Sequence, residues 1–174
     1  MKIVTYGLLS VMFVLSITNA YSGEWRSLHH DINIKFNDKI WSIIETNDEK
    51  GDTLVAFFDK SDGATFYIRI EYLKNAKDID NSLIAETISE GLYNSDPNLE
   101  VKNHQNLRIA SNDFYTIDYV FNNKKFGPQL IRHAFVKKEN YIVILLMSWP
   151  KNMQFETSNI FPLKHTLLLQ GLKL

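Results

Sequence analysis

The chain has 174 residues, of which 45% are hydrophobic and 13% aromatic, with seven glycines and four prolines. This composition excludes a disordered or low-complexity protein. The formal net charge of −1, from 19 Lys and Arg against 20 Asp and Glu, gives no electrostatic footprint for nucleic acid. Cysteine is absent, which excludes disulfides, thiol catalysis, cysteine-based zinc sites and lipid attachment of the lipoprotein type.

Residues 1–20 have the pattern of a secretory signal peptide. A positive start at Lys2 precedes the apolar stretch Ile3–Ile17, and the small residues Thr18 and Ala20 match a signal-peptidase site. The stretch is shorter than the roughly 20 residues that a bilayer span needs. We therefore expect a periplasmic or secreted protein, with leader 1–20, a single domain at 21–174 and no stable membrane insertion after cleavage. An uncleaved anchor is the alternative.

The first half of the expected domain is rich in strand patterns. Tyr21–His30 is expected to be a polar arm, and a polar loop is expected at Thr46–Asp52. Strands are predicted at Asp31–Phe36, Ile40–Glu45, Thr53–Phe58 and Ala64–Leu73. In the last strand one face carries Phe66, Ile68, Ile70 and Tyr72, and the other carries Tyr67, Arg69 and Glu71.

The hydrophobic period then changes to that of a helix. A cap at Asp80, Asn81 or Ser82 begins it, and it ends near Tyr93–Pro97 because a proline disfavours helical geometry in the residue before it. Its apolar stripe consists of Leu83, Ile84, Thr87, Ile88 and Leu92, with Glu86 and Glu90 on the opposite side.

The second half again consists of predicted strands followed by a helix. Strands are predicted at Leu99–Lys102, Leu107–Ala110, Phe114–Phe121, Gln129–Val136 and Tyr141–Met147. Tyr141–Met147 is apolar throughout and therefore belongs at the centre of a sheet covered on both faces. A terminal helix is expected to begin between Phe155 and Asn159, with Pro162 in its first turn and Gly171 as its C-cap. Hairpin-length loops favour a mainly antiparallel sheet with flanking helices, an α+β domain.

This order of elements resembles the PsbP-like superfamily, which includes PsbP of photosystem II, the Mog Ran-binding proteins and DcrB-like exported bacterial proteins. Phe36–Trp41 is similar to an early Phe-x-x-Pro-x-x-Trp-like segment but lacks the proline. Leu83–Leu92 resembles the middle helix, and Phe161–Leu169 the leucine-rich terminal one. The resemblance covers most of Asp31–Leu174 and implies an α/β/α sandwich used for binding and assembly, with no catalytic motif.

Two groups of residues are candidate sites of chemistry. His29, His30 and Asp31 can ligate a cation, but adjacent side chains of an extended segment point to opposite faces, so a solvated arm is expected. Asp118 and His133 lie in neighbouring predicted strands and can form the orienting pair of a general base. No nucleophile elbow accompanies them. A polar pair on an exposed sheet face, or a hydrogen-bonded core histidine, is the simpler interpretation.

The remaining charged groups favour structural roles. Glu86 and Glu90 are expected on a solvated helix face. Asp48–Asp52 and Asp59–Gly63 lack the ligand spacing of a calcium loop and are expected to be hairpin turns. Ordinary solubilising turns are expected for the basic residues, and a cluster that meets an acidic partner or anionic lipid is the alternative; these residues are Lys124, Lys125, Arg132, Lys137 and Lys138.

The leading hypothesis is an exported, non-catalytic module that binds a protein partner or supports assembly. The alternative is a carrier of a small apolar ligand or lipid, with a cavity of several hundred Å³. Core packing is expected for the aromatic strand residues, and lining such a cavity or an exposed binding patch is the alternative; these residues are Tyr67, Tyr72, Tyr115 and Tyr119. A hydrolase using Asp118 and His133 is the third. No catalytic, cofactor or metal residue is predicted, and no binding residue is assigned.

Overall fold

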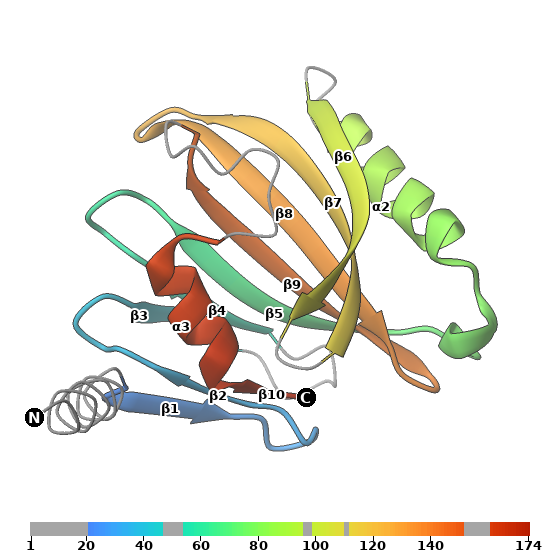
Figure 1. Cartoon of the computed structure of the whole chain (residues 1–174), viewed down its shortest axis with the longest axis horizontal. Coiled ribbons are helices and arrows are strands. Elements are labelled where there is room, and N and C mark those ends of the chain that lie inside the picture. Colours follow the sequence, from blue (N-terminus) through green and yellow to red (C-terminus); the bar gives the residue numbers. More distant parts are fainter. Residues whose placement is uncertain (1–20, 47–53, 96–98, 110–111, 152–160) are drawn as a thin grey trace, which may run out of the picture.

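A computed structural model describes residues 21–46, 54–95, 99–109, 112–151 and 161–174 (Figure 1). Its helical segments are the 3-10 helix η1 (Ala76–Asp78), α2 (Asn81–Ser95) and α3 (Leu163–Gly171). Its strands are β1 (Gly23–Arg26), β2 (Asn33–Phe36), β3 (Ser42–Thr46), β4 (Leu54–Phe58), β5 (Thr65–Tyr72), β6 (Glu100–Ile109), β7 (Asn112–Asn123), β8 (Gly127–Lys137), β9 (Tyr141–Pro150) and β10 (Leu172–Lys173).

Seven strands form one large antiparallel sheet in the order β3-β4-β5-β9-β8-β7-β6. The predicted central strand is confirmed, because β9 lies fourth of the seven, between β5 and β8. Val143, Leu145 and Met147 on one face of β9 are fully buried, whereas Leu146 on the other face is only half-buried. The two faces of the sheet are therefore covered to different extents.

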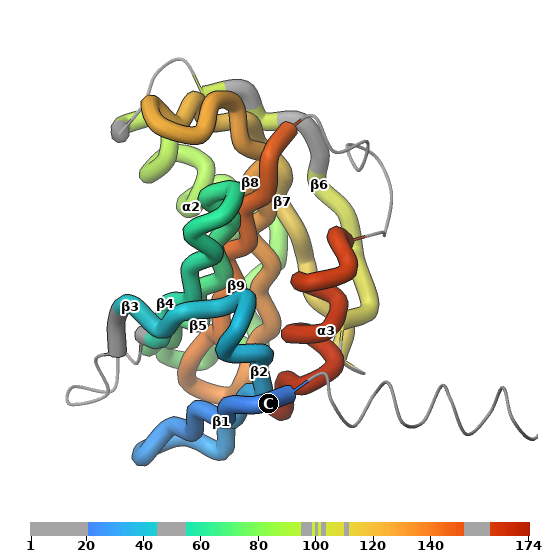
Figure 2. Tube along the Cα trace, turned by 90° about the vertical axis from the view of Figure 1, so that its left-hand side faces the viewer, coloured from blue at the N-terminus to red at the C-terminus, as the bar shows by residue number. Residues whose placement is uncertain are grey.

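The two helices lie on opposite sides of this sheet (Figure 2), which confirms the expected α+β class and its flanking helices. One face is closed by α3 together with a second, three-stranded sheet of order β1-β2-β10. The main core lies there and includes the fully buried side chains of Trp149, Phe57 and Phe66. Gly171 lets α3 approach β2 closely, because a Cβ at this position would collide with the backbone oxygen of Lys35.

The opposite face is covered over one end only. There α2 and η1 place Ile84, Ala85 and Ala76 on a smaller core that includes Ile117 and Phe135 of the sheet. The carboxylate of Asp80 accepts the backbone N–H of Ser82 at 2.7 Å, so Asp80 is the cap among the three candidates. The rest of this sheet face is free of a helix among the described residues.

Three predicted boundaries are wrong. The expected polar arm contains β1, because half-buried Trp25 packs against the core while the strand pairs with β2. The two short strands predicted between Leu99 and Ala110 form one long edge strand, β6, in which His104 and Asn106 remain exposed, so polar residues do not interrupt it. Gly171 is the last helical residue, and Leu172 follows it as the C-cap in extended geometry.

The terminal helix α3 begins at Leu163, after Pro162. The expected start between Phe155 and Asn159 lies outside the described residues, as do the leader, the loop at 47–53 and the turn expected at Asp48–Asp52.

Candidate binding groove

The register of β7 and β8 separates the two residues that were weighed as a catalytic pair. Asp118 lies opposite Arg132, and Ile117 lies opposite His133. Because successive side chains of a strand point to opposite faces, Asp118 and His133 lie on different faces of the sheet. The Asp118–His133 contact, which the sequence left open, is therefore not formed, and the hydrolase hypothesis loses the arrangement on which it depended.

Asp118 instead forms a buried ion pair on the face under α3. Its two oxygens accept hydrogen bonds from Nε and Nη2 of Arg132, both at 2.7 Å, and neither side chain is exposed. The guanidinium also lies 5.0 Å from the ring centroid of Phe161 and 5.8 Å from that of Trp149. These surroundings are those of a structural ion pair that no substrate can reach.

The other sequence candidates do not assemble into a site. No group of three potential metal ligands exists among the described residues. His30 packs against Tyr72 and Tyr141, with ring centroids 6.2 and 5.5 Å apart. Glu86 and Glu90 are exposed on α2, as expected.

The turn at Asp59–Gly63 is confirmed as a structural element. The carboxylate of Asp59 accepts the backbone N–H of Ser61 at 2.8 Å and pairs with Lys164 of α3 at the same distance. Two hydrogen bonds to Asp62 complete the surroundings of the Lys164 ammonium group. The turn is therefore tied to α3.

The five basic residues considered as a possible cluster do not lie together. Lys124 and Lys125 lie at the turn before β8, whereas Lys137 and Lys138 lie at its other end. Arg132 is buried within the strand. Lys137 donates to the backbone oxygen of Ile79 at 2.6 Å and so holds the segment before α2 against the sheet.

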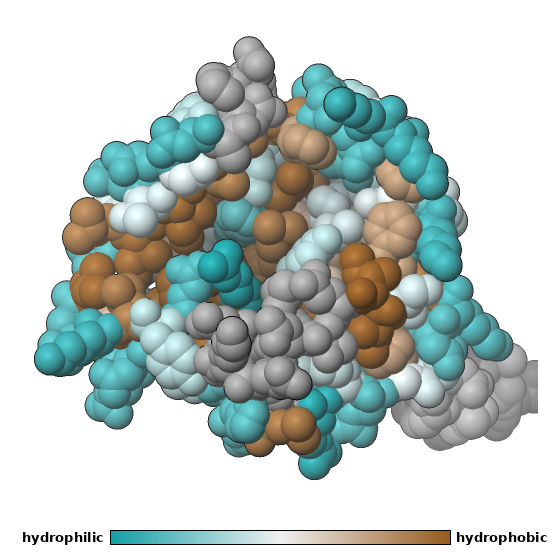
Figure 3. All heavy atoms as spheres, turned by 180° about the vertical axis from the view of Figure 1, so that it is seen from behind, coloured by the Kyte–Doolittle hydropathy of each residue, from teal (hydrophilic) through white to brown (hydrophobic). Residues whose placement is uncertain are grey.

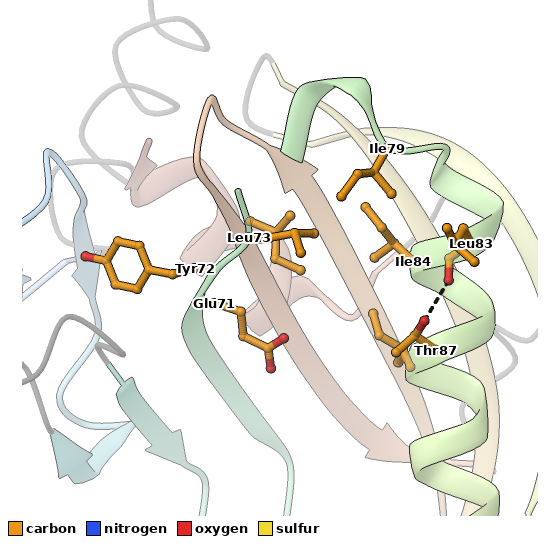
Figure 4. A pocket seen from close by; sticks show the side chains of 9 residues that line it. Glu71, Tyr72, Leu73, Ile79, Leu83, Ile84 and Thr87 are labelled. Carbon is orange, nitrogen blue, oxygen red and sulfur yellow. Dashed lines mark hydrogen bonds between the residues drawn. The ribbon is translucent and has the colours of Figure 1, made fainter. Parts of the chain in front are cut away.

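The open part of the sheet face forms a groove along α2. Its first hollow, of about 220 Å³, lies where β5 ends and α2 begins, with Leu73, Ile79, Leu83 and Ile84 around it (Figure 4). Glu71 points into the space between strand and helix, whereas the ring of Tyr72 points away from α2. Most of the lining is apolar.

Two further hollows continue the first one along the sheet. The middle hollow, of about 540 Å³, shares Glu71, Thr87 and Ile88 with the first and reaches His133 and Leu146. The third, of about 360 Å³, shares Tyr67 with the middle one and extends to β3, β4 and the end of β7. We call these three neighbouring hollows the α2 groove.

Exposed hydrophobic side chains gather at the rim of the α2 groove. Leu83 borders one end and is 56% exposed. Ile44 and Phe121 border the other end and are 53% and 37% exposed. Figure 3 shows hydrophobic surface in the hollowed part of this side of the molecule, with hydrophilic residues around it. The groove therefore joins apolar walls to an apolar, solvent-facing rim.

A few polar groups interrupt these walls. Arg69 and Glu71 form a partly exposed ion pair at 2.9 Å. The Tyr119 hydroxyl lies 3.1 Å from Nε2 of His133. Burial, and then the nearby charge of Arg69, lower the pKa of His133 to about 4, so its imidazole is neutral at physiological pH. Burial likewise raises the pKa of the Tyr119 hydroxyl.

Sequence reasoning missed the groove and Gln129, a buried polar residue that lines it. The signal was present in β8, where Gln129, Ile131 and His133 alternate with the residues that face α3. Two polar residues on one face of a strand indicate a partly wet face. Which part of that face α2 leaves open depends on tertiary packing.

No family model matches the sequence, and no curated protein matches it. Several solved structures, in contrast, match the structure of this chain. The solution structure of cyanobacterial PsbP (CyanoP) from Synechocystis sp. PCC 6803 aligns with a TM-score of 0.57 at 10% identity over 76% of this chain and 82% of that one. A Bacteroides thetaiotaomicron protein aligns with a TM-score of 0.57 at 11% identity over 89% of this chain. The match spans about half, 48%, of the Bacteroides protein.

These likenesses confirm the PsbP-like fold that the order of elements suggested. At such low identity they establish the fold alone. Within the described segments, no helix has both the length and the apolar character that a bilayer crossing requires.

Proposed function

We propose that this chain with the PsbP-like fold is an exported, non-catalytic binding or assembly module that holds part of a protein partner in the α2 groove. The observation that carries the proposal is the coincidence of a long apolar groove with an exposed hydrophobic rim at both of its ends. Exposed apolar surface that is contiguous and rimmed by polar residues is typical of interaction sites.

The chemistry of the described residues supports a binding role rather than a catalytic one. Asp118 is neutralised in a buried ion pair, and His133 has a tyrosine hydroxyl as its partner. The proposed export depends on the signal pattern of residues 1–20, as does a periplasmic or secreted location.

A carrier of a small apolar ligand is the second candidate. The middle hollow, at about 540 Å³, has the size of a small-molecule site. It is half-open along α2 and continues into hollows on both sides, whereas a carrier encloses most of the surface of its ligand. This continuity favours an elongated segment of a partner.

Site-specific cross-linking from inside the native envelope tests the proposal. A benzophenone side chain in place of Leu83 or Phe121 is expected to capture the same protein, because these positions border opposite ends of the groove. The matched control is Leu163, which is 75% exposed on α3, on the other side of the sheet. Capture from Leu163 alone, or from none of the three positions, contradicts the proposed function.

A further inference from the structure

The first residues of the described chain are held against the fold one after another. The hydroxyl of Tyr21 donates to the backbone oxygen of Leu167 in α3 at 3.0 Å. Its ring lies against the end of the same helix, because a Cβ built on Gly171 comes within 3.1 Å of Tyr21 Cε1. Tyr21 therefore packs on α3 where this helix meets the three-stranded sheet (Figure 1).

Ser22 and Gly23 continue this attachment. The backbone N–H of Ser22 donates to the backbone oxygen of Phe36 at 2.9 Å. The Ser22 hydroxyl donates to the Asp38 carboxylate at 2.5 Å and accepts the backbone N–H of Asp38 at 2.9 Å. At Gly23, where β1 begins, a side chain would collide with the ring of Phe36. The segment Tyr21–Gly23 is thus fixed to α3, to β2 and to the turn after β2.

This segment directly follows the bond at which the predicted leader would be cut. That bond joins Ala20 to Tyr21. Its hydrolysis consumes one water and leaves a carboxylate on Ala20 and an amino group on Tyr21. A protease binds the residues on both sides of the bond as an extended chain, so Tyr21 and Ser22 have to enter its active site. In the folded protein they are free to do so only after the segment has detached.

Detachment of the segment also disturbs β1. This strand pairs with β2 from Gly23 to Arg26, and Trp25 packs against the main core. Cleavage of a folded segment proceeds through the fraction of molecules in which the segment is open. Every contact of Tyr21–Gly23 lowers that fraction and therefore slows cleavage.

We propose that signal peptidase removes the leader before Tyr21–Gly23 attach to α3 and β2, and that the attached segment protects the Ala20–Tyr21 bond from later cleavage. The two fates considered for the leader, removal and retention as an anchor, are then the outcomes of one competition between cleavage and attachment. A chain that folds first keeps its leader. The inference rests on the export part of the proposed function and is independent of the α2 groove.

The order of folding and cleavage tests the inference on the full-length chain. The chain is diluted from urea into detergent micelles, and signal peptidase is added either at the moment of dilution or after circular dichroism shows that folding is complete. We expect the folded chain to be cut at least about tenfold more slowly. Mass spectrometry should show that the product begins at Tyr21.

Two variants loosen the segment. Tyr21→Phe removes the hydrogen bond to Leu167, and Ser22→Ala removes both side-chain bonds to Asp38. Each should speed cleavage of the folded chain about three- to tenfold, the effect of a hydrogen bond. Because both residues flank the bond that is cut, the folded rate is divided by the rate of the same variant cut at dilution. Tyr93→Phe, at a tyrosine 44% exposed on α2, is the matched control and should leave this ratio unchanged.

The outcomes separate this inference from the proposed function. Equal cleavage rates for the folded chain and for the chain cut at dilution overturn the protection by Tyr21–Gly23 and leave the proposed export standing. An unchanged ratio in both Tyr21→Phe and Ser22→Ala overturns it as well. Absence of cleavage in either form overturns both the inference and the proposed export. Binding of a partner in the α2 groove is decided separately, by cross-linking from Leu83 and Phe121.

Discussion

The two faces of the large sheet are built from the same strands but differ in how completely they are covered. The face under α3 is closed by a helix and a second sheet, and its core contains most of the large buried side chains. The face under α2 is closed over one end and open along the rest. Residues of one strand, β8, show the contrast directly. Arg132 on the closed face is fully buried and paired with Asp118, whereas neighbouring His133 on the open face lines the middle hollow of the groove.

This contrast indicates that the two faces of the sheet have different roles. A closed face with a buried ion pair gives stability and a defined register, because an unpaired charge there is costly. An open face tolerates exposed apolar surface only where something covers it or function requires it. Substitutions on the closed face should therefore change stability, and substitutions in the groove should mainly change binding.

The largest effect is expected at the buried ion pair. Asp118→Ala leaves the Arg132 guanidinium buried without its counter-charge and should lower the free energy of unfolding by about 3–5 kcal/mol. Urea unfolding measures it. The double variant Asp118→Val with Arg132→Met should recover most of the loss, since it removes both charges. A loss below about 1 kcal/mol in the single variant contradicts the structural role assigned to the closed face.

Two glycines provide a matched pair, one in each helix. Gly171→Ala places a methyl group against the Lys35 backbone oxygen and should cost about 1–3 kcal/mol, because neither α3 nor β2 can give way. Gly91→Ala in α2 meets no atom within 4 Å and should stabilise the protein by about 0.5–1 kcal/mol through its helix propensity. Thermal or urea unfolding gives both values. Effects of the same sign at both positions would contradict the different packing of the two glycines.

The order of elements could be predicted from the sequence, because it depends on local periodicity. The continuous apolar run of Tyr141–Met147 placed β9 at the centre, and three adjacent cap candidates, of which Asp80 is the cap in the structure, marked the start of α2. The Asp118–His133 contact could not be excluded in this way. It depends on the register of β7 and β8, in which a shift by one residue would turn every side chain to the other face.

The groove could not be predicted from the sequence at all. The apolar stripe of α2 predicted that the helix covers the sheet, but not how far along the sheet it lies. Leu83 was expected on the buried stripe and is instead 56% exposed at the groove rim. Similarly, core packing was the expected role of Tyr67 and Tyr119; it holds for buried Tyr119, whereas Tyr67 lines the third hollow.

Acidification should weaken the fold through one histidine on each face. Burial lowers the pKa of both His133 and His165 to about 4, against 6.5 for a free side chain. The unfolded state therefore takes up the proton first, so the stability present above pH 6.5 is lost as the pH falls towards 4. Between about pH 6.5 and pH 5 we expect a loss of about 1–2 kcal/mol per histidine, measured by urea unfolding.

Replacing either histidine separates the two contributions. His165→Gln on the closed face and His133→Gln in the groove should each remove about half of the histidine-dependent slope, whatever they do to stability at neutral pH. An unchanged slope in either variant would mean that the histidine is protonated as readily in the folded protein as in the unfolded one.

The smallest effect is expected at the exposed ion pair of the groove wall, which has the same chemistry as the buried pair. The side chains of Arg69 and Glu71 are 60% and 40% exposed, so solvent screens their attraction. Glu71→Gln should change the free energy of unfolding by no more than about 0.5 kcal/mol, against several kcal/mol for Asp118→Ala. Equal losses in the two variants would show that the groove wall is as tightly closed as the face under α3. That result would remove the physical basis for placing a partner in the α2 groove.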